Sequence, residues 1–403
     1  MWIAKKIRLH PTKEQEILFW KSAGVARWSF NYFLAENDRV YKEQHKYLSG
    51  CEVRRYINNV LKKTTHTWLK EVGSNVMKQG VQDAERALKD YMSGLRGKPH
   101  FKTKHKSQPC FYVNYETLTR KPNGFRGEKI GFVKTSELLP KLKDGEKYSN
   151  PRISYDGKYW YLSISYEIQK IDTVKLTNES LGIDLGVKDL AICSDGKTYK
   201  NINKSKEVCR LKKKLKREQR KLSRKMEHDV KGYCKNRKPI FERPLTECKN
   251  FQKQKKKVAL LHRRITNIRN NYLHQTTTEI VNKYPKRIVM ETLNINGMMK
   301  NKHLAEKIAE EKFYEFKRQI KYKAEFKDIQ VIEVSTWYPS SKLCSCCGHI
   351  KKDLKLSDRI YICSECGLKI DRDFNASLNL ANYESTYSHL KDNVDMYLSL
   401  LGN

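Results

Sequence analysis

Two cysteine pairs have the spacing of a metal site. Cys344 and Cys347 form a Cys-x-x-Cys-Gly motif, and Cys363 and Cys366 repeat that motif after fifteen intervening residues. Four thiolates at this spacing can converge into a tetrahedral shell, which suits Zn²⁺. Because a shell closed by four cysteines leaves no open position for water, such a zinc ion is structural. The motifs therefore predict a zinc ribbon over residues 342–368, and any catalysis must come from other residues.

Three carboxylates that are far apart in the chain have settings that favour a nuclease centre. Asp184 lies on the first strand of a glycine-punctuated hairpin, Glu291 ends a short apolar strand, and Asp373 opens a helix just beyond the cysteines. Each alone could merely stabilise a turn, a strand edge or a helix N-terminus. Their order is that of RNase H-like nucleases. Asp371 competes with Asp373 for the third position; we favour Asp373, with Asn375 nearby to orient it.

Carboxylates in this arrangement predict a two-metal hydrolase. Three such groups can bind two Mg²⁺ ions about 3.5–4 Å apart, and Mn²⁺ can substitute because both ions prefer oxygen ligands. One ion lowers the pKa of the attacking water, and the other stabilises the leaving 3′ oxygen of a phosphodiester. Neutralising the charge that develops on the phosphate is the main catalytic contribution.

The composition indicates a nucleic acid as the partner. The 403 residues include 82 Lys and Arg against 45 Asp and Glu, which gives a net charge of +37. A surface with that excess attracts a polyanion. The alternatives are a solvated basic surface or association with ribosomes. Since 38% of the residues are hydrophobic, packed cores are expected, and the length favours about three domains.

The sequence gives no signal for a membrane or for secretion. No apolar run approaches the roughly 20 residues that span a bilayer, and the first residues lack the apolar segment of a secretory signal. The seven cysteines outside the two pairs are scattered singly, which suggests a reducing compartment. We therefore expect a cytoplasmic protein.

The first part of the chain predicts a small β domain that carries a helical insertion. Residues 2–9 favour a strand, and Thr12 and Gln15 form a capping box at the start of a helix. Asp156-Gly157 is a strong hairpin signal, and the apolar residues after it alternate as in a half-buried strand. We predict helices over 17–34, 51–63 and 74–93, and strands and turns over 108–170.

The second part predicts an α/β unit with a basic helical hairpin. Residues 181–192 favour a strand, a tight glycine turn and a second strand. A helix over 204–226 has twelve Lys or Arg between residues 204 and 225, and a second helix has a heptad-like seam from Val258 to Tyr272. We expect an antiparallel hairpin over 204–283, with an irregular linker at 229–250. The remaining predicted elements are strands at 287–291 and 329–334 and helices at 303–326 and 373–383.

Together these motifs resemble TnpB proteins, which are transposon-encoded RNA-guided nucleases related to compact type V CRISPR effectors. The resemblance covers nearly the whole chain. It rests on Arg8–Gln15, Gly97–Lys104, Leu181–Gly186, Arg220–Lys225, Glu291–Asn294, Pro339–Cys344, the two cysteine pairs and Asp371–Ala376. The departures are Thr292, where many relatives have Asp, and residues 229–250, which look like an insertion with its own Cys234 and Cys248.

The resemblance implies an α/β multidomain protein with a RuvC-type, RNase H-like nuclease domain. Asp184, Glu291 and Asp373 would be its metal ligands. The implied domains are a wedge-like β-barrel (1–10 and 105–172), a helical recognition domain (11–104), the nuclease domain (178–341 and 369–385) with the inserted zinc ribbon (342–368), and a tail (386–403).

The resemblance also implies the partners. A guide RNA transcribed from the transposon end would pair with double-stranded DNA beside a short transposon-adjacent motif. The protein would read that motif and the shape of the heteroduplex, while base pairing reads the sequence. The single nuclease site would cut both strands. We expect one protein per RNA, in association with a bacterial or archaeal nucleoid.

Further nucleic-acid contacts are expected at three places. Arg359, between the cysteine pairs, resembles an arginine that guides substrate toward the nuclease in related effectors. One helix carries Ser74, Asn75, Lys78 and Gln79, which could meet the adjacent motif. On the basic hairpin, the candidates for contact with the nucleic-acid backbone are Lys212, Arg217, Arg220 and Arg224.

Three other functions stay open. A nuclease-inactive, RNA-guided DNA-binding repressor should have lost at least one of the three acids, and all three are present. A compact CRISPR effector with a crRNA would differ in its neighbouring DNA, which would contain a repeat array instead of transposon ends. A DNA-joining transposase fits the zinc ribbon and the basic excess less well.

Overall fold

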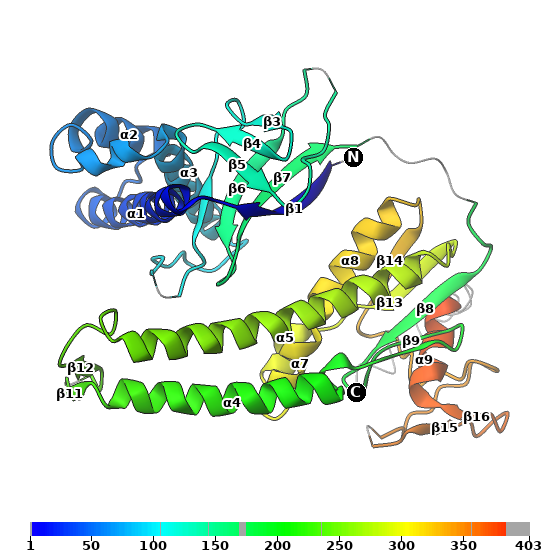
Figure 1. Cartoon of the computed structure of the whole chain (residues 1–403). Coiled ribbons are helices and arrows are strands. Elements are labelled where there is room, and N and C mark those ends of the chain that lie inside the picture. Colours follow the sequence, from blue (N-terminus) through cyan, green and yellow to red (C-terminus); the bar gives the residue numbers. More distant parts are fainter. Residues whose placement is uncertain are drawn as a thin grey trace. The chain divides into compact units, whose positions relative to one another are not determined.

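The computed structural model describes residues 2–104, 106–143, 145–168, 175–234, 236–355 and 357–383. The chain forms two compact units, Met1–Gln169 and Lys170–Asn403, which Figure 1 colours along the sequence. The predicted tail lies outside the described residues, and the finer domain boundaries stay predictions. None of the described helices combines the length and the apolar character that a bilayer-spanning segment needs.

An antiparallel sheet forms the base of the first unit. Its strand order is β2-β6-β7-β1-β5-β4-β3. Gly157 has a φ of 95° in the turn between β6 and β7, which confirms the predicted hairpin. The strands are β1 (Trp2–His10), β2 (Cys110–Tyr112), β3 (Thr119–Lys121), β4 (Gly124–Gly127), β5 (Gly131–Thr135), β6 (Ser149–Tyr155) and β7 (Trp160–Glu167).

The hydrogen bonding of this sheet does not close into a ring. Strands β2 and β3 stand at the two ends of the order and do not pair with each other in the described part of the chain. The wedge-like β-barrel therefore stays a prediction.

Helices between β1 and β2 cover this sheet. At the predicted capping box, Thr12 Oγ1 accepts from the N–H of Gln15 (3.3 Å) and Gln15 Oε1 accepts from the N–H of Thr12 (3.0 Å). The helix that starts there runs well past the predicted end at residue 34, because Asn37 and Val40 continue its buried face. The elements are α1 (Lys13–Gln44), α2 (Gly50–Tyr56), a π turn (Ile57–Leu61), a 3₁₀ turn (Thr67–Glu71) and α3 (Ser74–Met92).

The second unit contains a mixed five-stranded sheet, which confirms the α/β expectation. Its order is β10-β9-β8-β13-β14. β8, β9 and β10 form an antiparallel meander, whereas β13 pairs in parallel with both β8 and β14. The strands are β8 (Ser180–Leu185), β9 (Asp189–Cys193), β10 (Thr198–Lys200), β13 (Arg287–Glu291) and β14 (Gln330–Val334).

Helices cover both faces of this sheet. Side chains alternate between the faces of a strand. Ile183 and Met290 enter a core with residues of α5 (Lys249–Val281) and α8 (Phe313–Glu325), including Phe316. Val289 points to the other face and packs with Leu380 of helix α9 (Arg372–Ala381).

Gly182 lets α9 lie directly against β8. A Cβ at this position would stand 2.0 Å from the carbonyl oxygen of Ser377 and 2.4 Å from the backbone nitrogen of Ala381. Both atoms belong to the α9 backbone, which cannot move aside as a flexible side chain can. The missing side chain therefore fixes how closely α9 approaches the sheet.

The predicted basic hairpin is confirmed. α4 (Lys206–Glu227) and α5 run side by side in Figure 1. Across the pair, Gln254 Nε2 donates to the backbone oxygen of Glu218 (2.9 Å) and to its Oε2 (2.8 Å). The apolar seam is formed by Val208, Leu211, Leu215, Leu261, Ile265 and Ile268.

The irregular linker predicted at 229–250 is wrong. β11 (Val230–Tyr233) and β12 (Pro239–Phe241) pair as a short antiparallel ribbon at the tip of the hairpin. At its base, Arg243 Nη2 donates to Asp229 Oδ1 at 2.9 Å. Strands this short, with few apolar residues, give little periodic signal in a sequence.

The single helix predicted at 303–326 is also wrong. The segment forms α7 (Ala305–Glu311) and α8, and Lys312 between them is left-handed with a φ of 55°. A short α6 (Ile295–Met299) precedes them. The break accompanies a buried polar contact: Glu311 is only 3% exposed and accepts hydrogen bonds from the amides of Asn201 and Asn203.

Gly182→Ala should destabilise the second unit. The added methyl group collides with α9 backbone on two sides, and overpacking of this kind costs about 1–3 kcal/mol. Urea unfolding of the full chain should show a lower midpoint. Gly232→Ala is the control, because nothing lies within 4 Å of a Cβ there. Equal midpoints for the two variants would contradict the close approach of α9.

Glu311→Gln should change how stability depends on pH. Burial raises the pKa of Glu311 to about 7. Since the folded chain then holds this proton more tightly than the unfolded chain, the free energy of unfolding should fall as pH rises from about 4 to 7, by on the order of 3 kcal/mol. The glutamine variant has no titrating carboxyl at this position, so its free energy of unfolding should fall less as pH rises. Urea unfolding at several pH values checks this, and identical pH profiles would refute it.

Candidate metal centres

Asp184 and Glu291 lie close together because they end neighbouring parallel strands. The register pairs Ile183 of β8 with Met290 of β13, and the next residues along the strands are Asp184 and Glu291. The alternation of side chains puts both carboxylates on the sheet face that carries Gly182 and Val289, which α9 covers.

Asp373 joins these two acids from the first turn of α9. Asp371 is instead the N-cap: its Oδ1 accepts from the N–H of Asp373 and from the N–H of Phe374, each at 3.0 Å. Burial, the charge of Asp373 and the charge of Glu291, in this order, raise the pKa of Asp184 to about 7, and Asp371 adds less. The placement favours Asp373 over Asp371 as the third acid.

The crowding of like charges suits divalent cations. Burial also raises the pKa of Glu291. Partly buried carboxylates that repel one another are stabilised by a cation, and an all-oxygen donor set suits Mg²⁺ or Mn²⁺. Among the described residues, only the four cysteines bring three or more ligand atoms within 4.8 Å of one another. The acids are spread more widely, which is compatible with a pair of ions.

Two arginines contact the Asp373 carboxylate. Arg372 donates to Oδ1 from Nε (3.2 Å) and from Nη2 (3.0 Å), and its side chain is 14% exposed. Arg359 Nη1 lies 3.9 Å from Oδ2, and its side chain is 55% exposed. Arg359 was predicted at the nuclease site from the resemblance. Arg372 was not predicted, although its position next to Asp373 in the chain was a signal.

The strands of the cysteine module place both arginines. β15 (Ile360–Ile362) and β16 (Lys369–Asp371) are antiparallel, with Ile360 opposite Asp371. The ladder continues one residue further, because the N–H of Arg372 donates to the carbonyl of Arg359 at 2.9 Å. The module therefore delivers the two guanidinium groups to the same acid.

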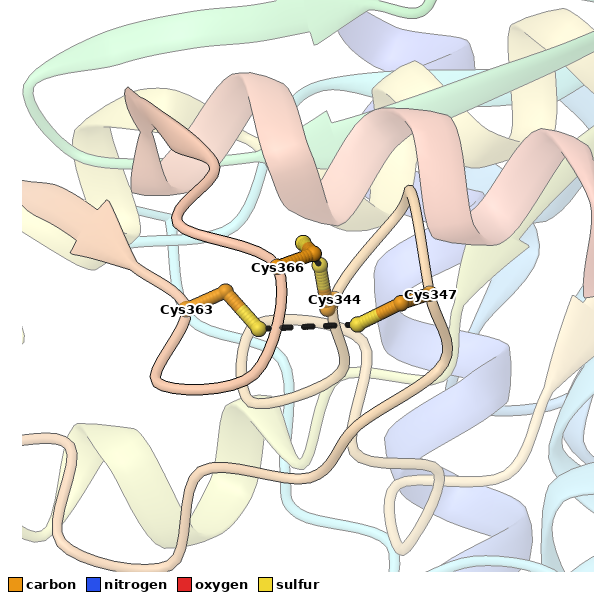
Figure 2. Close-up of side chains that lie close together, drawn as sticks. All are labelled: Cys344, Cys347, Cys363 and Cys366. Atoms are coloured by element: carbon orange, nitrogen blue, oxygen red, sulfur yellow. Dashed lines mark hydrogen bonds between the residues drawn. The ribbon is translucent and has the colours of Figure 1, made fainter.

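The four predicted cysteines converge, as Figure 2 shows. The sulfur atoms of Cys344 and Cys366 are 3.6 Å apart, and those of Cys347 and Cys363 are 3.5 Å apart. A tetrahedron with zinc–sulfur bonds of about 2.3 Å has edges of about 3.8 Å. The cluster therefore fits a closed structural zinc site.

Tight turns bring the sulfurs of each pair together. Gly348 and Gly367 follow the two pairs with φ values of 75° and 72°, in the left-handed region that glycine adopts without strain. Their N–H groups donate back to the carbonyls of Cys344 (3.0 Å) and Cys363 (3.2 Å). Backbone N–H donors, that of Cys366 first, lower the pKa of Cys363 to about 6. The second turn thus favours the thiolate form of Cys363.

Two buried asparagines of α9 anchor the cysteine module. Asn375 Nδ2 donates to the carbonyl of Leu343 (2.7 Å), and its Oδ1 accepts from the N–H of Ser345 (3.1 Å). Asn379 Nδ2 donates to the carbonyls of Ser340 and Leu343, both at 2.7 Å. The expectation that Asn375 orients Asp373 is therefore wrong: its amide holds the module to the helix.

The candidate contacts on α4 differ in how free their charges are. Arg217, Arg220 and Arg224 are exposed, and the nearest acid to Arg217 is Glu218 at 3.9 Å. Lys212 instead forms an ion pair with Glu310, so its charge is partly neutralised. The three arginines are thus the better placed for phosphate contacts.

The candidate motif readers begin α3 in the first unit. Ser74 and Lys78 are exposed, and Asn75 and Gln79 are half-buried. Gln79 Nε2 donates to Asp83 Oδ1 at 3.0 Å. Gln79 also lines a cavity of about 220 Å³. The cavity was not predicted; it is also lined by the basic residues Arg27, Lys102 and Arg152.

Models of three known protein families match separate stretches of this chain. A model described as "Probable transposase" matches residues 163–302, one described as "Cas12f1-like, TNB domain" matches 313–380, and one described as "Helix-turn-helix domain" matches 1–46. InsQ of Escherichia coli (strain K12), to which an RNA-guided DNA endonuclease activity is ascribed, is 29% identical over 94% of this chain and 91% of its own length.

Other relatives match over the same extent. A Streptomyces pristinaespiralis protein with the same ascribed activity is 28% identical over 94% of this chain and 88% of its own length. TnpB-like protein L770 of Acanthamoeba polyphaga mimivirus is 24% identical over 94% of this chain and 72% of its own length. The chain is therefore similar to TnpB proteins over nearly its whole length.

A solved structure shares the fold of this chain. The protein of a Cas12f1-sgRNA-target DNA complex, determined by cryo-EM, matches with a TM-score of 0.54 at 16% identity. The match covers 92% of this chain and 83% of that one. At this identity the likeness concerns the fold alone.

Cys363→Ser should abolish metal binding by the cysteine module. Replacing one of four converging thiolates opens the shell, so zinc content by mass spectrometry should fall from about one ion per chain to near zero. The control is Cys346→Ser, which changes an exposed cysteine outside the cluster and should keep the metal. Equal metal contents in the two variants would exclude the four-cysteine site.

Proposed function

We propose that this chain is an RNA-guided DNA endonuclease that hydrolyses phosphodiester bonds at a RuvC-type centre. The observation that carries the proposal is the convergence of Asp184, Glu291 and Asp373 from two strand ends and one helix N-terminus. The ascribed activities of InsQ and the Streptomyces relative, which match this chain nearly end to end, support the same function.

The acids have distinct structural supports for holding metal ions. Asp184 and Glu291 would bind from the rigid edge of the sheet, and Asp373 from a helix fixed by the Gly182 contact and by the cysteine module. Mg²⁺, when bound, supplies Lewis-acid activation of water and stabilisation of the leaving oxygen. The four cysteines would hold Zn²⁺ in a structural role.

The chain's own cations would bind and orient the DNA strand. Arg359 is largely exposed beside Asp373, so its guanidinium can contact a phosphate without leaving a buried ion pair. Its geometry suits an exposed guide of the strand toward the acids.

A guide RNA and a double-stranded DNA target are the proposed partners. The net charge of +37 requires a large polyanion for compensation. The exposed arginines of α4 lie on one long helix and suit the backbone of an RNA or of an RNA–DNA heteroduplex. Ser74, Asn75, Lys78 and Gln79, at the start of α3, are proposed to meet the transposon-adjacent motif. A crRNA-guided effector would share this chemistry and is separated by the neighbouring genomic DNA.

Asp184→Asn should abolish cleavage without abolishing binding. The amide cannot hold a divalent cation as a carboxylate does, and losing several kcal/mol of charge stabilisation slows cleavage on the order of a thousandfold. Plasmid cleavage by the RNA complex checks the rate, and filter binding checks the affinity. Asp373→Asn should behave alike. Asp371→Asn keeps an equally good N-cap and should still cut. Full cleavage by Asp184→Asn would refute the proposed centre.

A triple variant should bind the guide RNA more weakly, namely the one in which glutamine replaces Arg217, Arg220 and Arg224. The affinity of this variant should also depend less on the salt concentration. Each lost phosphate contact should reduce the slope of log K against log salt by about 0.7–0.9. RNA titrations between low and moderate salt give that slope. Lys212→Gln is the internal control: because Glu310 already pairs with Lys212, its slope should change less. An unchanged slope in the triple variant would place the RNA elsewhere.

A further inference from the structure

Arg372 places a largely covered guanidinium against Asp373, one of the three acids. Nε and Nη2 both donate to one oxygen, Asp373 Oδ1. The backbone of Arg372 is also fixed, because its N–H extends the strand ladder of the cysteine module and α9 begins at the same residue. The side chain of Arg372 is 14% exposed, whereas that of Arg359 is 55% exposed. Arg372 is therefore more restricted in its position than a surface arginine.

The charge of Arg372 acts on more than its direct partner. Arg372 lowers the pKa of Asp184, whereas burial, Asp373 and Glu291 raise it. The guanidinium therefore offsets part of the repulsion among the three acids when no metal is bound.

The geometry also sets up a competition. Two N–H donors occupy Asp373 Oδ1, and a carboxylate oxygen offers two lone pairs. A cation that binds this oxygen must displace at least one of the donors. The other oxygen, Oδ2, lies 3.9 Å from Nη1 of Arg359.

We propose that Arg372 is a positioning residue that acts through Asp373. It holds the acid cluster together in the metal-free chain and competes with the divalent cation for Asp373 Oδ1, so that metal loading releases the guanidinium. This inference rests on the proposed function, because it requires the three acids to be the metal site.

A purely structural ion pair predicts a different outcome. If Arg372 only stabilises the start of α9, its removal lowers stability and leaves metal affinity unchanged or weaker. If Arg372 competes, its removal makes metal binding tighter, because a positive charge beside the site is gone. The sign of the change in affinity distinguishes the two.

The test measures the affinity of the full chain, without RNA, for Mn²⁺. Electron paramagnetic resonance of the free ion reports how much Mn²⁺ stays unbound. Arg372→Gln should bind Mn²⁺ about tenfold more tightly than the wild type at the site that Asp184→Asn removes. Arg372→Lys keeps the charge and should stay within about threefold of the wild type. In thermal unfolding without Mn²⁺, the melting temperature of Arg372→Gln should be lower than that of the wild type. When Mn²⁺ is added, the melting temperature of Arg372→Gln should rise by more than that of the wild type.

Unchanged or weaker Mn²⁺ affinity in Arg372→Gln would overturn the inference while leaving the proposed function intact. If Asp184→Asn removes no Mn²⁺ site from the wild type, the proposed centre itself fails. Should Arg372→Gln not fold, the wild type still decides. Its Arg372 Nε–H signal in NMR, assigned with Arg372→Lys, should be protected without Mg²⁺ and lose protection at the midpoint of Mg²⁺ binding. A signal that stays protected at saturating Mg²⁺ would refute the competition.

Discussion

The contact between α9 and β8 at Gly182 is the constraint on which the proposed nuclease centre depends. Asp184 and Glu291 are placed by the register of two strands, and this pair alone would be an ordinary sheet edge. The third acid reaches them only because α9 lies close enough for its backbone to occupy the space of a missing side chain. A single glycine thus determines whether three acids distant in sequence share one site.

The cysteine module supports the same contact from the other side. Two buried amides of α9, those of Asn375 and Asn379, bind the backbone at the start of the module. The module's second strand then leads directly into α9 through Asp371 and Arg372. A structural metal in the four-cysteine site would therefore fix the first turn of α9 as well as its own loops. This connection links the four-cysteine cluster to the helix that carries Asp373.

Much of this arrangement could be predicted from the sequence, because the informative residues are either separated by a short, fixed number of positions in the chain or arranged periodically. The cysteine pairs, the Thr12–Gln15 capping box, the Asp-Gly hairpin and the hairpin seam of α4 and α5 were all predictable for that reason. The three acids could be ordered along the chain, although their meeting depended on a parallel register that no local pattern encodes.

The features that were missed depend on contacts between distant segments. The break at Lys312 accompanies the burial of Glu311 against Asn201 and Asn203, which are about a hundred residues away in the chain. Asn375 was assigned to Asp373, its neighbour in sequence, whereas its amide binds backbone more than thirty residues earlier. Arg372 had no periodic signal, and its position next to Asp373 in the chain was the one indication. The geometry of its guanidinium shows that it contacts Asp373.

The most direct measurement is the position of metal ions in a crystal of the full chain soaked with Mn²⁺, located by anomalous scattering. The account predicts two peaks about 3.5–4 Å apart, bounded by the carboxylates of Asp184, Glu291 and Asp373. Peaks confined to other surfaces, with these three side chains free of metal, would contradict it.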